Sequence, residues 1–259
     1  MYKMVACEFN RTLINSEEAI STSTMIEIDK LRRDKGIVFT VMTNELPDYV
    51  LDYNADFPFI DYIVGYNGAY IYDAVNEKCI FKKSIGISII KKVYRLFNDL
   101  DLCFYTSQYG AYWGNYREKY YCSVITDFNK FSDVHRGDVF KIAIICSNKK
   151  EVDRVFKALD DYDVNVDVRI LKKNGKIFIE LLSKLNSKMN GLHRICRIKK
   201  ISYEEILAIV CSDTDLCVMD KVGKSVAIGG CCDKVRRVAT EFTGTNEEKG
   251  VEQVLKKYM

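Results

Sequence analysis

The sequence lacks the marks of several classes of protein. Its 259 residues include only two prolines and 14 glycines, which excludes collagen-like and proline-rich disordered chains. No stretch approaches the roughly 18 consecutive apolar residues of a transmembrane helix, so no membrane span is predicted. The first residues also lack the long apolar stretch and the small-residue cleavage site of a secretory signal.

An excess of charge of one sign is absent as well. The chain has 39 Lys and Arg residues against 36 Asp and Glu residues, a formal net charge of +3. Its short basic runs, such as Lys82-Lys83, form no stripe along the sequence. The sequence therefore predicts neither a nucleic-acid partner nor an anionic membrane partner, and it indicates no particular protein partner.

Histidine is scarce, and the cysteines are scattered. The two histidines, His135 and His193, lie far apart, and the ten cysteines contain no Cys-x-x-Cys pair. A zinc site is therefore not predicted. Because the chain shows no secretory signal, we expect free thiols in a reducing compartment and predict a cytoplasmic protein.

The composition is that of a globular protein, since 48% of the residues are hydrophobic and 29% are charged. At roughly 150 residues per domain, the length allows one or two domains. Apolar runs at 4–7, 36–42 and 60–65 predict buried strands. Between the first two, a capping box of Thr24 and Glu27 predicts a helix over 24–35. This order of elements predicts a parallel α/β sheet.

The middle of the chain has a different pattern. Helical and extended segments mix there with a predicted hairpin around Asn174-Gly175, which is typical of an α+β unit. The parallel pattern returns after residue 185, and a second capping box, Thr245 and Glu248, predicts the start of the last helix. We therefore predict an α/β protein with a doubly wound, parallel-sheet (Rossmann-like) core formed by residues 1–80 and 186–259. Residues 81–185 are predicted to form an inserted α+β domain.

Polar side chains follow four of the predicted strands. Ligands of open parallel sheets bind at the carboxyl ends of the strands. A polar group after one strand is explained by turn formation alone. Polar groups after four strands, two of them with carboxylates, predict a binding site. The residues that follow the four strands are Glu8, Asn10 and Thr12; Thr43 and Asn44; Asn67 and Gly68; and Ser212, Asp213 and Asp215.

Six segments, taken in order, resemble the haloacid dehalogenase superfamily of phosphatases, in its Cof-like branch with a large cap domain. They are Met4 to Asn15, VFTVMTNE, YNGAYIYD, LLSKLNSKMNGL, ILAIVCSDTDLCVM and VAIGGCCDKVRRVATEFTGTNEEKGVEQVL. The resemblance covers nearly the whole chain. It implies a core domain with the inserted domain as a cap, and a phosphomonoesterase acting on a small phosphorylated metabolite such as a sugar phosphate. The aromatic stretch YTSQYGAYWGNY is interpreted as cap core and interface, with a substrate-facing wall as the alternative.

The resemblance also implies roles for individual residues. Glu8 stands at the position of the nucleophile and Asn10 at that of the general acid/base. Thr43 and Lys188 complete the catalytic set, and the same two residues with Thr12 and Asn44 would bind the phosphate. A Mg²⁺ ion would be held by Glu8, the backbone carbonyl of Asn10, Asp213 and Asp215.

Several of these positions depart from the family pattern. The family carries Asp at positions 8 and 10, Gly at 11, and Gly-Asp at 210 and 211, where this chain has Glu, Asn, Arg and Val-Cys. The longer Glu8 side chain displaces the attacking oxygen by roughly 1 Å, which can cost about a hundredfold in rate. Loss of the acid/base group costs about 10² to 10⁴. A thiol is also a poor ligand for Mg²⁺.

Two interpretations follow. Because the departures concentrate in the chemical motifs, we predict a catalytically impaired or inactive member of the family, a pseudoenzyme. Mg²⁺ is then a cofactor only if the site is still competent, and otherwise there is none. The alternative is an active phosphatase of a small phosphorylated metabolite that uses Glu8 as its nucleophile.

Overall fold

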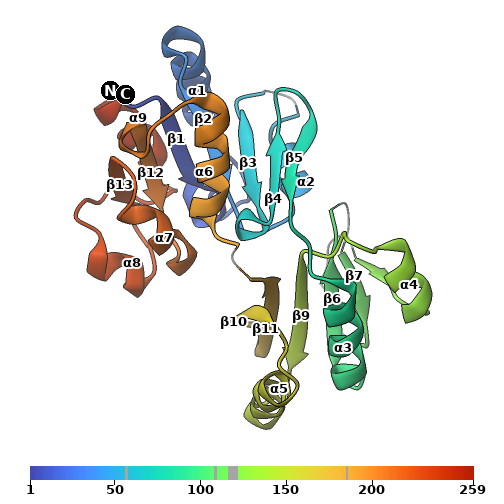
Figure 1. The fold of residues 1–259 in the computed structure, drawn as a ribbon. Coiled ribbons are helices and arrows are strands. Elements are labelled where there is room, and N and C mark those ends of the chain that lie inside the picture. Colours follow the sequence, from blue (N-terminus) through green and yellow to red (C-terminus); the bar gives the residue numbers. More distant parts are fainter. Residues whose placement is uncertain (56–57, 108–109, 116–121, 185) are drawn as a thin grey trace. The chain divides into compact units, whose positions relative to one another are not determined.

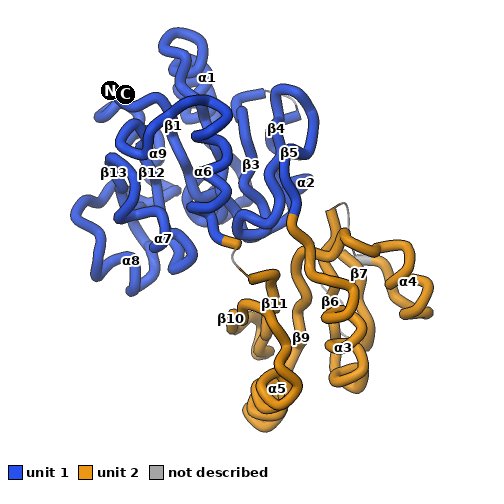
Figure 2. Tube along the Cα trace, in the orientation of Figure 1, with its two compact units in different colours: residues 1–82, 187–259 blue, residues 83–186 orange. Residues whose placement is uncertain are grey.

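The structure, a computed structural model, describes residues 1–55, 58–107, 110–115, 122–184 and 186–259. It divides into two compact units, which Figure 2 shows in different colours. Unit 1 comprises Met1–Lys82 and Ser187–Met259, and unit 2 comprises Lys83–Asn186. Unit 2 is therefore inserted in the sequence of unit 1. These bounds differ by one or two residues from the predicted segments.

Unit 1 is built on a seven-stranded sheet of order β13-β12-β1-β2-β3-β4-β5 (Figure 1). The five strands from β13 to β3 run parallel, while β4 and β5 extend the sheet in antiparallel pairing. The predicted α/β fold with a Rossmann-like parallel core is thus confirmed, and the antiparallel edge is an addition to it. The strands are β1 (Met4–Glu8), β2 (Val38–Met42), β3 (Tyr62–Gly65), β4 (Tyr70–Asp73), β5 (Lys78–Lys82), β12 (Ile206–Val210) and β13 (Lys224–Ala227).

Helices pack on the sheet of unit 1 in two groups. Helix α6 contacts β3 and α7, and α7 also contacts β12 and β13, whereas α1 packs against α9 and β2. Every residue of β1 and β12 is buried, as expected for central strands of a parallel sheet that is covered on both faces. The helices and short turns of unit 1 are η1 (Phe9–Leu13), α1 (Thr22–Lys35), α2 (Pro47–Asp52), η2 (Tyr66–Gly68), α6 (Lys188–Lys199), η3 (Tyr203–Glu205), η4 (Asp213–Asp215), α7 (Leu216–Met219), α8 (Asp233–Val238) and α9 (Gly250–Tyr258).

The predicted start of α1 is wrong by two residues. The helix begins at Thr22, after Ser21, so Thr24 lies inside it and is buried rather than capping it. Its predicted end is confirmed, because Gly36 adopts the left-handed conformation (φ 65°) that terminates a helix.

The last helix, in contrast to α1, begins later than predicted. Thr245 and Glu248 do exchange hydrogen bonds, from Glu248 N to Thr245 Oγ1 (3.2 Å) and from Thr245 N to Glu248 Oε2 (2.8 Å). These bonds close a turn instead of starting a helix, because Lys249 then adopts a left-handed conformation (φ 60°). Helix α9 therefore starts at Gly250.

Unit 2 contains a six-stranded sheet of order β10-β11-β9-β6-β7-β8. The predicted hairpin is confirmed: β10 and β11 pair antiparallel around Asn174 and Gly175, whose positive φ angles (50° and 74°) suit a two-residue turn. The elements of unit 2 are α3 (Ile87–Phe97), β6 (Asp101–Tyr105), β7 (Gly110–Trp113), β8 (Cys122–Val124), α4 (Phe128–Val134), β9 (Lys141–Cys146), α5 (Lys149–Asp161), β10 (Val166–Lys173) and β11 (Lys176–Ser183).

The aromatic stretch of unit 2 lies partly outside the described residues, at 108–109 and 116. In its described part, Tyr112 is buried, and the Trp113 ring meets Tyr94 edge to face with centroids 5.1 Å apart. The Trp113 indole also donates a hydrogen bond to the Asn98 carbonyl (2.9 Å). These contacts assign the described part to the packing of unit 2.

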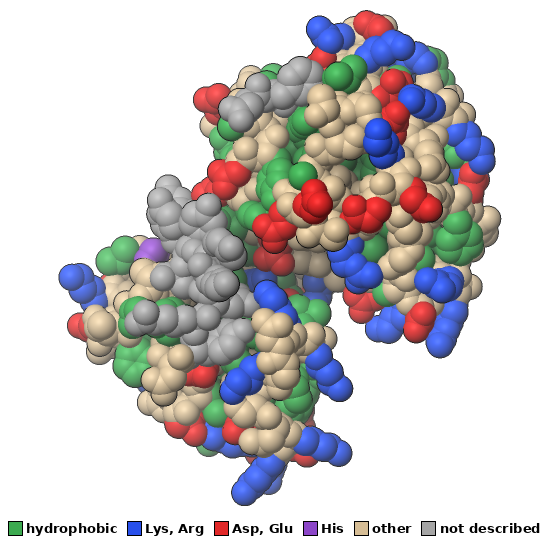
Figure 3. All heavy atoms as spheres, turned by 180° about the vertical axis from the view of Figure 1, so that it is seen from behind, with side chains coloured by type: hydrophobic (Ala, Val, Ile, Leu, Met, Phe, Trp, Pro, Cys, Tyr) green, Lys and Arg blue, Asp and Glu red, His purple; other side chains and the backbone are tan. Residues whose placement is uncertain are grey.

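The surface and the helices add two observations. On the face drawn in Figure 3, Lys and Arg side chains lie among Asp and Glu side chains. Among the residues that the structure describes, no helix has the length and apolar character needed to cross a membrane.

Candidate functional site

Three neighbouring parallel strands of unit 1 end at one edge of the sheet. Glu8 is the last residue of β1 and pairs in register with Met42, after which Thr43 follows β2. On the other side of β1, strand β12 ends at Val210 and is followed by Cys211. The register of the parallel strands therefore gathers Glu8, Thr43 and Cys211 at the carboxyl edge where ligands of such sheets bind.

A fourth segment brings a lysine to the same edge. Lys188 is the first residue of α6, and the N-cap residue Ser187 accepts a hydrogen bond from Asn190 N (3.1 Å). The η2 turn holds this helix end closely, because a Cβ on Gly68 (φ +90°) would lie 2.1 Å from the Ser187 carbonyl oxygen. One turn later, Gly191 abuts Val64 of β3, where a Cβ would lie 2.4 Å from Cγ1. Glycine at both positions lets α6 approach the sheet edge.

The Lys188 ammonium lies at the centre of a buried cluster. It donates hydrogen bonds to Glu8 Oε2, to Asp215 Oδ1 (2.7 Å) and to Thr214 Oγ1 (2.7 Å). A lysine ammonium has three N–H groups, so these acceptors use all of them. Glu8, Lys188 and Asp215 are 2%, 0% and 0% exposed, respectively. We call these three residues the buried triad.

The carboxyl groups of the buried triad have opposite pKa shifts. Burial and the neighbouring charge of Asp215 raise the pKa of Glu8 well above its usual range, although Lys188 opposes the shift. Burial also acts on Asp215, but there the charge of Lys188 and hydrogen bonds outweigh it and lower the pKa. Against the effect of burial, both carboxyl groups raise the pKa of Lys188. These directions favour protonation at Glu8 and ionisation at Asp215 and Lys188, a combination with no net charge.

Backbone amides hold Asp215 in place. Its Oδ2 accepts hydrogen bonds from Cys211 N (2.9 Å) and Ser212 N (2.8 Å), and from Ser212 Oγ (3.1 Å). Both oxygens of this carboxylate are therefore occupied by donors of the chain itself.

The predicted phosphate-binding residues connect to this cluster. Thr43 Oγ1 donates to Asn10 Oδ1 (3.1 Å) and accepts from Glu45 N (3.0 Å). Asn44 Nδ2 donates to Thr214 Oγ1 (3.4 Å), which also accepts the hydrogen bond from Lys188 Nζ. The structure thus brings Glu8, Asn10, Thr43, Asn44, Lys188 and Asp215 to one site. The role of Thr214 as an acceptor for Lys188 was not predicted.

Arg11 occupies an unusual backbone position three residues after Glu8. It lies within η1 in the left-handed conformation (φ 58°, ψ 17°), which glycine adopts without strain. Its Nη2 donates to the Gly230 carbonyl oxygen (2.9 Å). Burial raises the pKa of the nearby Cys211 thiol to about 11, and the charge of Arg11 opposes that shift. The guanidinium therefore lies within electrostatic range of Cys211.

Asp213 pairs with a surface lysine. Its side chain is 54% exposed and lies 3.3 Å from Lys234. The Asp213 carboxylate thus faces Lys234, and its predicted role as a Mg²⁺ ligand stays a prediction.

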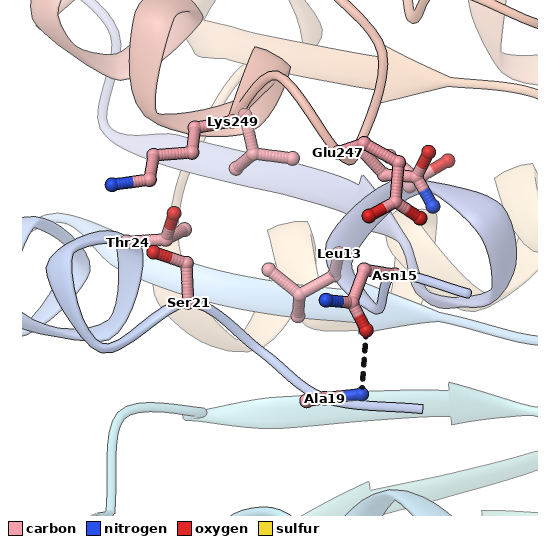
Figure 4. A pocket seen from close by; sticks show the side chains of 10 residues that line it. Leu13, Asn15, Ala19, Ser21, Thr24, Glu247 and Lys249 are labelled. Carbon is pink, nitrogen blue, oxygen red and sulfur yellow. Dashed lines mark hydrogen bonds between the residues drawn. The ribbon is translucent and has the colours of Figure 1, made fainter. Parts of the chain in front are cut away.

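Thr12 lines a separate cavity of about 140 Å³, formed by residues of unit 1 (Figure 4). Figure 4 shows Ser21, Thr24 and Lys249 around this cavity together with Asn15, whose side chain accepts a hydrogen bond from Ala19 N (2.9 Å). Glu8, Thr43 and Lys188 do not line it. Thr12 is thus buried within η1 and lines this cavity, while its side chain also opposes the rise that burial causes in the pKa of Cys211 at the sheet edge.

The residues at the edge do not fit a Mg²⁺ ion. Lys188 and two backbone amides occupy the Asp215 oxygens, Lys188 occupies Glu8 Oε2, and Asp213 points to Lys234. At the position where the family carries an aspartate, Cys211 offers soft sulfur, whereas Mg²⁺ requires hard oxygen ligands in octahedral geometry. In the described ranges, no group of three or more His, Cys, Asp and Glu side chains is arranged to hold a metal ion.

Comparisons with known proteins agree with this fold. The sequence model of the haloacid dehalogenase-like hydrolases matches residues 5–255. Among curated proteins, the chain is similar to the 5-amino-6-(5-phospho-D-ribitylamino)uracil phosphatase of Bacillus subtilis strain 168. The two are 23% identical over 266 residues, which cover 98% of this chain and 97% of the relative.

Solved structures are similar over the whole length. A haloacid dehalogenase-like hydrolase from Bacteroides thetaiotaomicron superposes with a TM-score of 0.86 at 19% identity and covers 100% of both chains. A sugar phosphatase of haloacid dehalogenase subclass IIB gives a TM-score of 0.78 at 18% identity and covers 99% of this chain and 98% of its own. At these levels of identity the likeness shows the fold.

Proposed function

This chain belongs to the haloacid dehalogenase-like hydrolase family, and we propose that it binds a small phosphorylated metabolite, such as a sugar phosphate, with little or no turnover. In this proposal, unit 1 is the core domain that holds the phosphoryl group and unit 2 is the cap domain that selects the rest of the metabolite. The names of two relatives support the ligand class, since one is a phosphatase of a phosphorylated ribitylaminouracil and the other a sugar phosphatase.

The buried triad carries the proposal of impaired turnover. Nucleophilic attack on phosphorus requires an ionised carboxylate with a free oxygen in line with the leaving group. Glu8 instead has a raised pKa, and its Oε2 accepts a hydrogen bond from Lys188. At the acid/base position, the Asn10 amide accepts a hydrogen bond from Thr43 and has no carboxyl proton to transfer.

The first test measures phosphate release from a panel of phosphomonoesters in the presence of Mg²⁺, with Glu8→Ala as the control. We expect no release above the control. Release that disappears in Glu8→Ala would overturn the proposal, because it would make Glu8 a working nucleophile.

A second set of variants tests whether the residues that depart from the family pattern cause the impaired turnover. The variant Glu8→Asp/Asn10→Asp/Cys211→Asp restores the carboxylates of the family pattern, and we expect Mg²⁺-dependent hydrolysis to appear in it. The double variant Glu8→Asp/Asn10→Asp is the matched control that retains Cys211. A triple variant that folds, binds phosphate and still hydrolyses nothing would show that these three positions do not explain the impairment.

The second candidate function is an active phosphatase. It is favoured by the place of Glu8, which ends β1 at the sheet edge beside Lys188. In that reaction an ionised Glu8 oxygen would bond to phosphorus, the bond to the leaving oxygen would break, and water would hydrolyse the resulting acyl phosphate. Hydroxylamine trapping followed by mass spectrometry distinguishes the two functions, because a hydroxamate at residue 8 forms only from that intermediate.

The cysteines support a reducing compartment. The nine cysteines whose side chains the structure describes are free thiols, and most of them are buried. Disulfides are rare in the cytoplasm, so this pattern supports the proposal that the protein works there.

A further inference from the structure

An anion site needs positive charge. The ammonium group of Lys188 is already bonded within the protein and is not available for an anion. All three of its N–H groups are bonded to Glu8, Thr214 and Asp215. The charge of Lys188 is also balanced by the carboxylate of Asp215, with which it forms a buried ion pair (2.7 Å). Lys234, on α8, forms an ion pair with Asp213. A phosphoryl group bound at this edge therefore requires another cation.

Arg11 has the properties of that cation. Its backbone lies at the carboxyl end of β1, three residues after Glu8, and its side chain is exposed. A guanidinium has five N–H donors in a planar fork, and the hydrogen bond to the Gly230 carbonyl uses one of them. Within the described part of the chain, Arg11 pairs with no carboxylate. Its remaining donors therefore stay available for phosphate oxygens, with which arginine forms bidentate hydrogen bonds.

The substitutions around Arg11 change the charge of the edge in one direction. Relative to the family pattern, Arg in place of Gly at position 11 adds one positive charge, and Cys in place of Asp at position 211 removes one negative charge. With Asn10 in place of Asp, which removes a further negative charge, the three substitutions raise the formal charge by three. The positions that no longer fit Mg²⁺ thus add positive charge to the edge.

We propose that Arg11 is a built-in cation of the phosphate site, so that this chain binds phosphate without a divalent metal ion. Its side chain is anchored to the Gly230 carbonyl on one side and presents its remaining N–H groups to the phosphoryl oxygens on the other. This inference rests on the proposed function, since it assumes that the edge binds a phosphoryl group.

Thermal unfolding of the full chain with inorganic phosphate as the probe tests the inference. A ligand that binds only the folded state raises the melting temperature, so a phosphate titration gives an apparent Kd. For the unmodified protein we expect the same phosphate-dependent rise in EDTA and in MgCl₂. For Arg11→Gly we expect an apparent affinity about tenfold to a hundredfold weaker, as for the loss of hydrogen bonds to a charged group.

Two further variants keep the test specific. Arg11→Gly relieves the left-handed backbone, so the variant is expected to fold. Arg11→Lys retains the charge and should keep part of the affinity, while Arg237→Ala removes an exposed arginine of α8 and should leave the titration unchanged.

The outcomes separate this inference from the proposed function. A phosphate-dependent rise that requires MgCl₂, or one that Arg11→Gly leaves intact in EDTA, overturns the role of Arg11 and leaves the phosphate site standing. No rise in the unmodified protein under either condition overturns both.

Discussion

Each unit of this molecule buries a lysine among polar partners, but the surroundings of the two lysines differ. In unit 2, Lys141 pairs with Glu180 (3.0 Å) and lies 4.2 Å from the centroid of the Tyr105 ring. In unit 1, Lys188 faces two buried carboxyl groups, Glu8 and Asp215.

The partners of Lys188 make its cluster titratable. One ammonium with two carboxyl groups is neutral only when one of them is protonated, and the raised pKa of Glu8 favours protonation there. The cluster therefore holds a titratable group at the sheet edge where ligands of such sheets bind.

The largest effect should come from removing each lysine. Lys188→Met leaves two carboxyl groups facing each other in a buried space, and we expect it to lower the free energy of unfolding by about 3–5 kcal/mol. Lys141→Met leaves the buried Glu180 without this partner and should cost about 1–3 kcal/mol. Chemical denaturation of both variants at pH 7 measures the difference. Equal losses would contradict the distinction between the two clusters.

The second comparison concerns two glycines with positive φ. Gly68 in unit 1 touches Ser187, whereas a Cβ on Gly175 in unit 2 would meet nothing within 4 Å. Gly175→Ala should therefore cost only the backbone strain of about 1–2 kcal/mol. Gly68→Ala adds the displacement of α6 to the same strain and should cost about 3 kcal/mol or more.

Because that displacement moves Lys188, Gly68→Ala should also weaken phosphate binding, which Gly175→Ala should not. Thermal unfolding with and without phosphate measures both effects. If both alanine variants behave alike, the contact between η2 and α6 does not position the lysine.

The titration of Glu8 gives the third prediction. A carboxyl group whose pKa is raised by folding binds more protons in the native state, so its contribution to stability falls as the pH rises from the unfolded pKa of about 4.5 through the folded value. Glu8→Gln cannot ionise, and it should flatten this part of the stability profile. The variant should gain about 1 kcal/mol or more relative to the unmodified protein between pH 5 and pH 8.

Denaturation midpoints measured across that range check the prediction. Parallel profiles for the two proteins would show that Glu8 is ionised throughout, and the neutral state of the buried triad would then be wrong.

Much of the fold could be predicted from the sequence because the central strands are long apolar runs in parallel order. The elements that were missed are short. Strand β4 has four residues beside a turn, too few to show a period, and β7 has four residues within an aromatic stretch. The starts of α1 and α9 were misplaced because a capping pair in the sequence does not determine the backbone conformation of the residue before the helix. Ser21 is that residue for α1, and Lys249, which is left-handed, is that residue for α9.

The sequence was enough to predict which strand ends form the site. It was not enough to predict in which direction each side chain there points. Glu8, Thr43 and Asp215 follow apolar runs, and the carboxyl ends of parallel strands converge. Asp213 and Asp215 lie two residues apart in the single turn η4, so one carboxylate faces Lys188 while the other faces Lys234. Nor does the residue type at position 11 indicate which carbonyl its guanidinium contacts.

The smallest effect should come from the ion pair that lies outside the site. Asp213 and Lys234 are largely exposed, with side chains 54% and 68% accessible, so water and salt screen their attraction. Lys234→Ala should therefore change the free energy of unfolding by at most about 1 kcal/mol and leave phosphate affinity unchanged. Denaturation and the phosphate titration in EDTA measure both quantities. A loss of affinity as large as that of Arg11→Gly would mean that Lys234 shares the binding of the anion, and the positive charge at the sheet edge would then belong to two residues rather than to Arg11.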